Sequence, residues 1–387
     1  MRLLPRILAL AVMLTAAALP LSLAMSGCTK TPTNTGALIP AGELPDLHRA
    51  GLNKQWEAHV KLFGTENIRK VWRVGESIYV ATSEARLVRI EAKTGAVRWQ
   101  QGLGAENFII YKPVELKTAD NSPTHEVLVV TGGEVFTFDL GTGDETRPIA
   151  HLGLSVSCDP VVIGNTLCVG GASIFYGLYL DHPDLRRWNI PARGDVFVSS
   201  PAVLGNDLFF ASRQGRLWRV TGDTGVWDWK DRKTNGDVVA GLAADNDALY
   251  VPSLDQHMYA FSADTGGQLW ETQLEGRLEQ TPVVTGEAVL VRSVNHGIYV
   301  LNRNNGIVRF HADDVTSVAA GNEKYIWVMD SAGNLKSLDL DDGDVMATTP
   351  APGVQMVVPN PVDRTVLLVT HGGLIGAYSS EQRSQVK

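Results

Sequence analysis

The chain has 387 residues, of which 44% are hydrophobic, and its 42 aspartates and glutamates outnumber its 34 lysines and arginines to give a formal net charge of −8. This negative balance argues against binding nucleic acid or an anionic lipid face through a broad basic patch. It is ordinary for a soluble exported protein.

The first 27 residues have the composition of a secretory signal peptide. Arg2 and Arg6 precede a long run of leucine and alanine, and small residues end the segment just before Cys28. A transmembrane anchor is the alternative, but Pro20 interrupts the apolar run and no positively charged stop follows it. We therefore expect residues 1–27 to be removed.

The stretch Met25-Ser26-Gly27-Cys28 resembles the lipobox of bacterial lipoproteins. The resemblance implies that Cys28 carries acyl chains, palmitate among them, which hold a domain stably at a membrane surface. Thr29 stands where an aspartate would signal inner-membrane retention, so the resemblance implies an outer-membrane anchor facing the periplasm. Residues 28–50 are rich in Thr, Pro and Gly and predict a flexible tether to a folded domain spanning 51–387.

A turn followed by a strand that contains tryptophan recurs along this domain. The pattern is seen in AKTGAVRW (92–99), GDTGVWDW (222–229) and ADTGGQLW (263–270). The turn glycines are Gly95, Gly143, Gly225, Gly266, Gly306 and Gly343, with Asp184 in the place of a seventh. Four residues after these positions stand Trp99, Arg147, Trp229, Trp270, Phe310, Ala347 and, after Asp184, Trp188. The turns mostly lie 40 or 41 residues apart, which indicates a repeat architecture.

Each unit contains four short apolar or alternating runs separated by turns. In the fourth unit we expect strands at 201–204, 208–211, 216–220 and 226–230. Four antiparallel strands in about 41 residues are the content of a β-propeller blade. The glycine supplies the positive φ of the tight turn, and we expect the tryptophan to pack its outer strand against the next blade.

The fifth unit shows why the blades should stack. Its alternation places Met258 and Ala260 on one face of a strand and Tyr259 and Phe261 on the other. Both faces are apolar, as expected for a sheet between two neighbouring blades.

The last unit lacks a fourth strand, because the chain ends shortly after VLLVTHGGLIGAYSSEQ (366–382). The N-terminal segment NKQWEAHV (53–60), in which Trp56 resembles Trp99 in context, can supply it. Closure of the ring by this strand removes an open sheet edge. The sequence thus predicts an all-β, eight-bladed propeller, with seven blades as the alternative.

Cys158 and Cys168 form an even pair in an oxidising compartment if Cys28 is acylated. The Gly-Asn turn at 164–165 would place Val161, not Cys158, opposite Cys168. Neither cysteine has a CxxC context. The sequence leaves two interpretations of this pair, a disulfide or two buried thiols.

From about residue 51 to 381, the quoted repeats and SSPAVLGNDLFFASRQGRLWRV resemble the pyrroloquinoline-quinone-type propeller repeat. Combined with the lipobox and eight units, the chain resembles the BamB family of outer-membrane assembly lipoproteins. The resemblance implies a non-enzymatic scaffold without a cofactor. Its partners would be BamA, other subunits of the assembly machinery, unfolded outer-membrane proteins and, through the lipid, the outer membrane.

The same resemblance points to docking residues for BamA in two loops. The first loop, ARGDVFVSSP, contains Arg193 and Asp195, and the second, GDVVAG, contains Asp237. The register differs from the family's in the first loop, and Val239 replaces one acid of an Asp-x-Asp pair in the second. Charged loop residues that are merely solvated are the simpler interpretation.

An exported propeller that binds a small ligand or quinone in its central channel is the alternative function. Quinone-dependent dehydrogenases share the repeat, but they use a vicinal cysteine pair and a Ca²⁺ held by several converging oxygens. The sequence has no adjacent cysteines, and its Asp-Asp pairs at 313–314 and 341–342 lie in or near turns. It has no HExxH, HxH, GxSxG or P-loop motif, so it predicts no catalytic or metal-binding residue.

Overall fold

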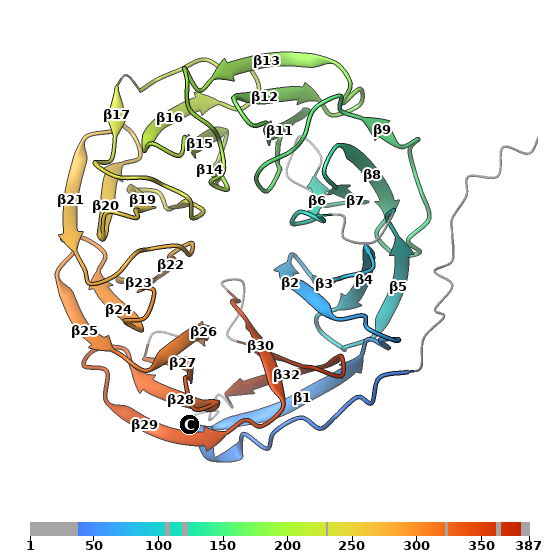
Figure 1. Ribbon diagram of the computed structural model, residues 1–387, viewed down its shortest axis with the longest axis vertical. Helices are drawn as coiled ribbons and strands as arrows, with labels where there is room; N and C mark the ends of the chain where they lie inside the picture. The colour runs from blue at the N-terminus through green and yellow to red at the C-terminus, as the bar shows by residue number, and fades with distance from the viewer. Residues whose placement is uncertain are drawn as a thin grey trace, which may run out of the picture.

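The chain folds into a ring of eight four-stranded antiparallel sheets, the blades of a β-propeller (Figure 1). The structure is a computed structural model that describes residues 38–104, 109–117, 123–229, 231–321, 324–360 and 365–380. The predicted signal peptide and Cys28 lie outside these residues. The prediction of eight blades is confirmed, and the alternative of seven is wrong.

Blades 1 to 4 each follow the chain from the innermost strand to the outermost. Blade 1 is β2 (Ile68–Val74), β3 (Ser77–Thr82), β4 (Arg86–Glu91) and β5 (Val97–Gly102). Blade 2 is β6 (Val114–Lys117), β7 (Pro123–Val130), β8 (Glu134–Asp139) and β9 (Ala150–His151). Blade 3 is β10 (Val161–Ile163), β11 (Thr166–Gly170), β12 (Ile174–Tyr179) and β13 (Arg186–Pro191). Blade 4 is β14 (Ala202–Leu204), β15 (Asp207–Ala211), β16 (Arg216–Thr221) and β17 (Arg232–Lys233).

Blades 5 to 7 have the same order, and blade 8 is completed by the first strand of the chain. Blade 5 is β18 (Ala243–Ala244), β19 (Ala248–Pro252), β20 (His257–Ser262) and β21 (Gln268–Gln273). Blade 6 is β22 (Val283–Thr285), β23 (Ala288–Arg292), β24 (Ile298–Asn302) and β25 (Val308–Ala312). Blade 7 is β26 (Val315–Gly321), β27 (Tyr325–Asp330), β28 (Asn334–Asp339) and β29 (Val345–Pro350). Blade 8 is β30 (Val354–Val358), β31 (Val366–Thr370), β32 (Leu374–Ser380) and β1 (Leu52–His59).

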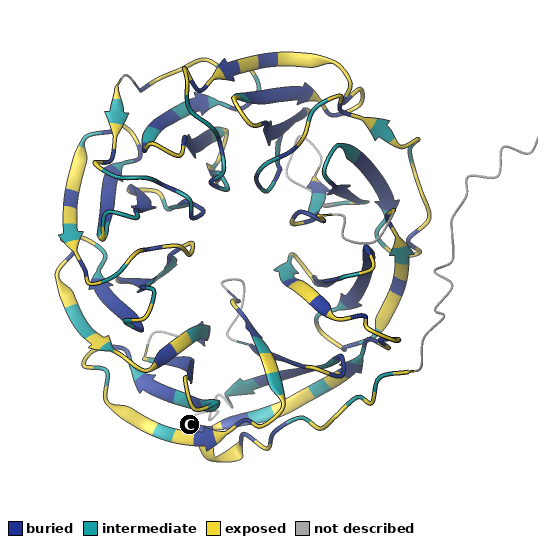
Figure 2. Cartoon of the chain, viewed as in Figure 1, coloured by how far each residue is buried: buried dark blue, intermediate teal, exposed yellow. Residues whose placement is uncertain are grey.

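The hydrophobic core lies between the blades and not at the centre of the ring (Figure 2). Tyr259 and Phe261 pack toward blade 4, whereas Met258 and Ala260 pack toward blade 6. The two apolar faces predicted for this strand are therefore both buried, and each blade shares one cluster with each neighbour.

The repeated tryptophans hold neighbouring blades together, as expected. The indole N–H groups of Trp56, Trp99, Trp188, Trp229 and Trp270 donate to backbone carbonyls of Ala92, Leu140, Gly222, Asp264 and Arg303 at 2.8–3.3 Å. Each acceptor lies in the turn of the following blade. The ring then lies against the turn glycine, where a Cβ atom would come within 2.4–2.8 Å of Trp56, Trp99, Trp188, Trp229, Trp270 or Phe310.

Arg147 takes the tryptophan position between blades 2 and 3. Its guanidinium donates to the carbonyl of Leu180 at 3.4 Å and pairs with Asp181 at 3.3 Å and Glu126 at 2.7 Å. Charge and hydrogen bonds thus replace the indole contact at this junction.

The structure corrects the predicted outer strand of blade 4. Of the predicted strand 226–230, the described residues 226–229 form only an isolated bridge between Val220 and Trp227, and the regular strand is Arg232–Lys233. Trp229 packs on Gly266 of the next blade. Asp231 has a φ of +53°, which extended backbone does not have.

The predicted tether is also too long, because residues 38–50 pack on the ring. Leu47 is fully buried, and residues 48–50 form a short 3-10 helix, η1 (His48–Ala50). The side chains of Thr370, Tyr378 and Trp327 donate hydrogen bonds to carbonyls of Ala41, Pro45 and Ala50, at 3.0, 2.9 and 3.3 Å. No helix among the described residues has the length and apolar character needed to cross a membrane.

Cys158 and Cys168 are free, buried thiols, so the disulfide that the sequence left open is not formed. Val161 is the residue opposite Cys168, as the hairpin turn predicts. Cys158 instead lies before β10, beside Gly170.

Candidate functional site

Two loops that join blades 3, 4 and 5 carry the candidate partner-binding residues. Loop 192–201 joins β13 to β14, and loop 234–242 joins β17 to β18. Both contact the β15–β16 turn, where the N–H of Arg213 donates to Val196 O at 2.7 Å and the N–H of Val238 donates to Arg213 O at 2.6 Å. The two loops and the turn therefore form one continuous surface.

An aromatic cluster fixes the first loop beneath this surface. Phe197 is fully buried, with its ring centroid 5.5 Å from those of Phe175 and Phe210 and 5.4 Å from that of Trp218. These edge contacts between aromatic rings hold the loop backbone to blades 3 and 4. The polar residues before Phe197 are thus presented by a rigid support.

Asp195 and Asp237 both accept hydrogen bonds from the β15–β16 turn. The carboxylate of Asp195 accepts the backbone N–H groups of Val196 at 2.7 Å and Gln214 at 2.9 Å. The carboxylate of Asp237 accepts the Nε–H of Arg213 at 3.2 Å. The structure thus brings these two predicted residues to one turn. None of these hydrogen bonds joins one acid to the other.

Arg193 lies at the beginning of the first loop, and its side chain contacts Trp227 of blade 4. It has a φ of +56°, a strained conformation for a residue with a Cβ atom, and its guanidinium lies 5.5 Å from the ring centroid of Trp227. Trp227 is 42% exposed. Sequence reasoning missed Trp227, although the two tryptophans of GVWDW in a repeat that needs only one were a signal for it.

The comparisons with known proteins agree with this architecture. A sequence profile of the family described as "Outer membrane protein assembly factor BamB" matches residues 42–146 and 233–386, more than half of the chain. The chain belongs to the BamB family. Asp237 lies inside the second matched segment, whereas Arg193 and Asp195 lie between the two.

Individual BamB relatives are distant in sequence. The BamB of Francisella salina is 24% identical over 173 residues, 42% of this chain and 32% of that protein. The BamB of Bordetella pertussis is 22% identical over 339 residues, 73% of this chain and 85% of that protein. The chain spans about a third of the length of the Francisella salina relative, so the match to that protein is partial.

Two further similarities bear on the fold and on the enzyme alternative. The crystal structure of BamB from Moraxella catarrhalis superposes with a TM-score of 0.66 at 15% identity, covering 86% of this chain and 99% of that one. A quinohemoprotein alcohol dehydrogenase of Pseudomonas putida is 24% identical over 255 residues, 60% of this chain and 32% of that protein.

A bound Ca²⁺ of the dehydrogenase type would need several oxygen ligands that converge on one point. Among the described residues, no three His, Cys, Asp or Glu side chains are grouped so that they could hold a metal ion. The two cysteines lie ten positions apart. Burial raises the pKa of the Cys158 thiol to about 12, so this thiol stays protonated and is a poor nucleophile.

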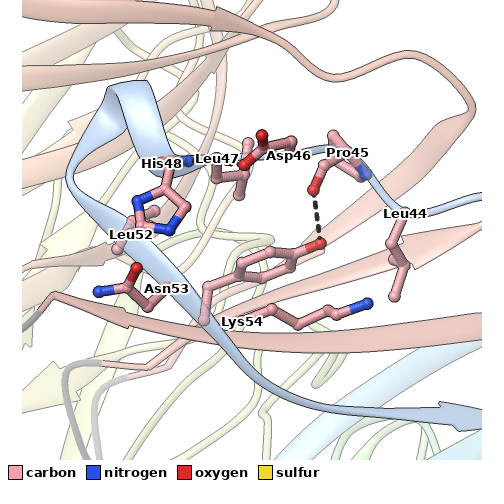
Figure 3. Close-up of a pocket in the computed structure, with 9 residues that line it drawn as sticks. Leu44, Pro45, Asp46, Leu47, His48, Leu52, Asn53 and Lys54 are labelled. Atoms are coloured by element: carbon pink, nitrogen blue, oxygen red, sulfur yellow. Dashed lines mark hydrogen bonds between the residues drawn. The ribbon is translucent and has the colours of Figure 1, made fainter.

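A pocket of about 370 Å³ lies where the N-terminal segment meets blade 8 (Figure 3). Leu44, Leu47 and Tyr378 line it, with His48 and Lys54 at its polar side. The Tyr378 hydroxyl donates to Pro45 O, and Lys54 pairs with Glu57 at 2.7 Å. The Tyr378 hydroxyl and the Lys54 ammonium are thus both paired within the chain, and the pocket belongs to the packing of the N-terminal segment.

Proposed function

We propose that this chain is a non-enzymatic scaffold subunit of the outer-membrane β-barrel assembly machinery. It docks on BamA together with other subunits and aids the insertion of outer-membrane proteins. Cys28, acylated after removal of residues 1–27, holds it at the periplasmic side of the outer membrane. The observation that carries the proposal is the match to the BamB family over both halves of the ring.

The surface formed by the loops of blades 3 to 5 supports BamA docking. Hydrogen bonds to the β15–β16 turn orient the carboxylates of Asp195 and Asp237, so little side-chain entropy is lost on binding. Arg193 adds a guanidinium group to this surface. Among the described residues, no carboxylate forms an ion pair with it. Such an arrangement favours a partner surface of mixed charge and fixes its register.

Affinity purification of the full-length lipoprotein from detergent-solubilised membranes tests the proposal. We expect BamA among the recovered proteins. Asp237→Lys should reduce the recovery of BamA about tenfold, because the new lysine would repel the basic groups of BamA that bind the Asp237 carboxylate. Asp264→Lys is the matched control. Asp264 is also an exposed acid near an arginine, Arg219 at 3.6 Å, but it lies in the β20–β21 turn, away from the two loops.

Each outcome is decisive. Recovery of BamA with wild type and Asp264→Lys, but not with Asp237→Lys, supports both the function and the docking surface. Equal loss in both variants contradicts the surface. Enrichment of another envelope protein in place of BamA contradicts the assembly function.

The similarity to a quinohemoprotein alcohol dehydrogenase supports a second candidate, an exported propeller that binds a quinone in its central channel. Addition of pyrroloquinoline quinone and Ca²⁺ to the purified chain tests it. Dye reduction with alcohol substrates would support this candidate, whereas absence of both quinone binding and turnover would exclude it.

A further inference from the structure

The innermost strands of the ring carry an excess of positive charge on two neighbouring blades. In blade 1, β2 reads IRKVWRV and contains Arg69, Lys70 and Arg73, and in blade 2, β6 contains Glu115 and Lys117. The innermost strands of the other six blades, β10, β14, β18, β22, β26 and β30, contain no charged residue. The eight innermost strands around the ring axis thus have four basic residues and one acidic residue, in a chain with a net charge of −8 (Figure 1).

The basic side chains of these two blades are accessible to solvent. Arg69 and Lys70 are exposed in β2, as are Lys112, two residues before β6, and Lys117 within β6. Among the described residues, no carboxylate forms an ion pair with Lys70, Lys112 or Lys117. We define the basic inner wall as Arg69, Lys70, Arg73, Lys112 and Lys117.

The acidic side chains next to these bases are held by other groups of the chain. The carboxylate of Glu115 accepts the Tyr79 hydroxyl at 3.0 Å. The carboxylate of Asp159, at the start of blade 3, accepts the backbone N–H of Lys112 at 3.1 Å and the hydroxyl of Ser200 at 3.0 Å. Neither acid pairs with a lysine ammonium group, so the basic inner wall keeps its positive charge.

Apolar side chains lie next to the basic inner wall. Trp72 of β2 is half-buried and packs against the hydrophobic cluster between blades 1 and 2, and Lys70 Nζ lies 5.9 Å from its ring centroid. The innermost strand of blade 8, β30, lies beside β2, where Gln355 donates to the carbonyl of Ile68 at 3.4 Å and Met356 is half-buried. A ligand on this wall therefore meets cations and apolar surface together.

We propose that the basic inner wall binds an acidic segment of another polypeptide, in which several glutamates or aspartates alternate with apolar residues. Arg69 and Arg73 lie about 13 Å apart along β2, at about 3.3 Å per residue, and Lys112 and Lys117 belong to the next blade. One carboxylate cannot contact bases so far apart, whereas successive acidic residues of one segment can.

Charge also decides where such a segment binds. The whole chain is negative and repels an acidic segment, while bases gathered inside a ring of low-dielectric protein attract it. A flat membrane surface cannot reach strands that the blades surround (Figure 1). The wall belongs to blades 1 and 2, whereas the candidate BamA surface belongs to blades 3 to 5, so the inference does not depend on the proposed function.

A fluorescent twelve-residue peptide of alternating glutamate and valine, titrated at low salt with the purified full-length chain in a non-ionic detergent, tests the inference by anisotropy. We expect saturable binding, and the dissociation constant should rise at least tenfold in the double variant Lys70→Gln, Lys112→Gln. The double variant Lys70→Arg, Lys112→Arg keeps both charges and should change the constant less than threefold. A peptide with lysine in place of glutamate should bind at least tenfold more weakly.

The matched control is the double variant Lys93→Gln, Lys233→Gln. It removes the same charge from two exposed lysines, in the turn after β4 and in the outermost strand β17, and it should change the dissociation constant less than twofold. Equal weakening by this variant and by Lys70→Gln, Lys112→Gln would show that net charge alone attracts the peptide, and would overturn the inference.

A photo-cross-linking group in the middle of the same peptide locates the site. We expect cross-links to residues 68–74 or 110–117. Absence of saturable binding, or cross-links confined to the outermost strands or to loops 192–201 and 234–242, would overturn the inference. Displacement of the peptide by an equal concentration of citrate would also overturn it, because a small anion would then suffice.

Discussion

At the scale of single residues, the turn glycines have two distinct reasons to be glycine. Gly225 has a φ of +65°, and a Cβ atom there would lie 2.6 Å from the ring of Trp188. Gly205, in the same blade, has a φ of +60° but no atom within 4 Å of such a Cβ. A comparison of substitutions at Gly205 and Gly225 therefore distinguishes the cost of backbone strain from the cost of steric overlap.

We expect Gly205→Ala to lower the free energy of unfolding by about 1 kcal/mol, the cost of a left-handed backbone with a Cβ. Gly225→Ala should lower it by about 2–4 kcal/mol, because steric overlap with Trp188 is added to that cost. Urea unfolding followed by tryptophan fluorescence measures both. Equal losses would show that the contact with Trp188 contributes nothing.

The candidate site shows what a residue pattern alone predicts. The acids Asp195 and Asp237 could be selected from their loops, but their partners Arg213 and Gln214 could not. These partners lie in a turn whose approach to both loops depends on the packing of three blades. The second tryptophan of GVWDW was a signal for Trp227, but the contact of Trp227 with Arg193 crosses from blade 3 to blade 4 and could not be predicted.

At the scale of elements, a buried ion pair fixes the connection from β1 to blade 1. Arg86 donates to both carboxylate oxygens of Glu66, at 3.0 and 2.9 Å, and to the carbonyl of Lys61 at 2.7 Å. Both side chains are at most 3% exposed. The loop that leads from the closing strand into β2 is therefore held by a buried ion pair.

Glu66→Gln should lower the free energy of unfolding by about 3–5 kcal/mol, because the Arg86 charge would stay buried without its counter-ion. Glu57→Gln is the control, since the pair of Glu57 with Lys54 is about half exposed and should contribute at most 1 kcal/mol. Thermal and urea unfolding of both variants measure the difference. A loss below 1 kcal/mol in Glu66→Gln would contradict this role for the pair.

Most elements could be predicted because their signals repeat along the sequence. The spacing of Gly and Trp is a property of the chain itself, and it gave the blades and the closing strand. The shortened β17 and the packed segment 38–50 could not be predicted in this way. Trp327, Thr370 and Tyr378 hold that segment through backbone carbonyls, which any sequence can provide.

At the scale of the whole molecule, the fold buries several groups in their neutral form. Burial, with smaller contributions from neighbouring acids, raises the pKa of Tyr111, Tyr259 and Tyr378 to about 12, and burial raises that of Cys158 to about 12. In the unfolded chain the thiol ionises near pH 8.5 and the phenols near pH 10. The unfolded state therefore loses these protons at a lower pH than the folded state.

The contribution of these groups to the free energy of unfolding should accordingly be constant below about pH 8. It should fall as the pH rises from about 8.5 toward 12. Urea unfolding at pH 7.5, 9 and 10.5 measures the slope. Tyr111→Phe with Tyr378→Phe should flatten the part of the slope above pH 9.5. An unchanged slope in this variant would show that these two phenols ionise equally in both states.

The pairing of β1 with β32 has a consequence for the time course of folding. During synthesis, β1 is made before the other strands of the ring, but its partner β32 is made last. Blades 1 to 7 can fold one after another, each packing on the blade before it, while β1 is still unpaired. A chain that ends before residue 374 would lack β32, the partner of β1. The ring can therefore close only after the whole chain has been made.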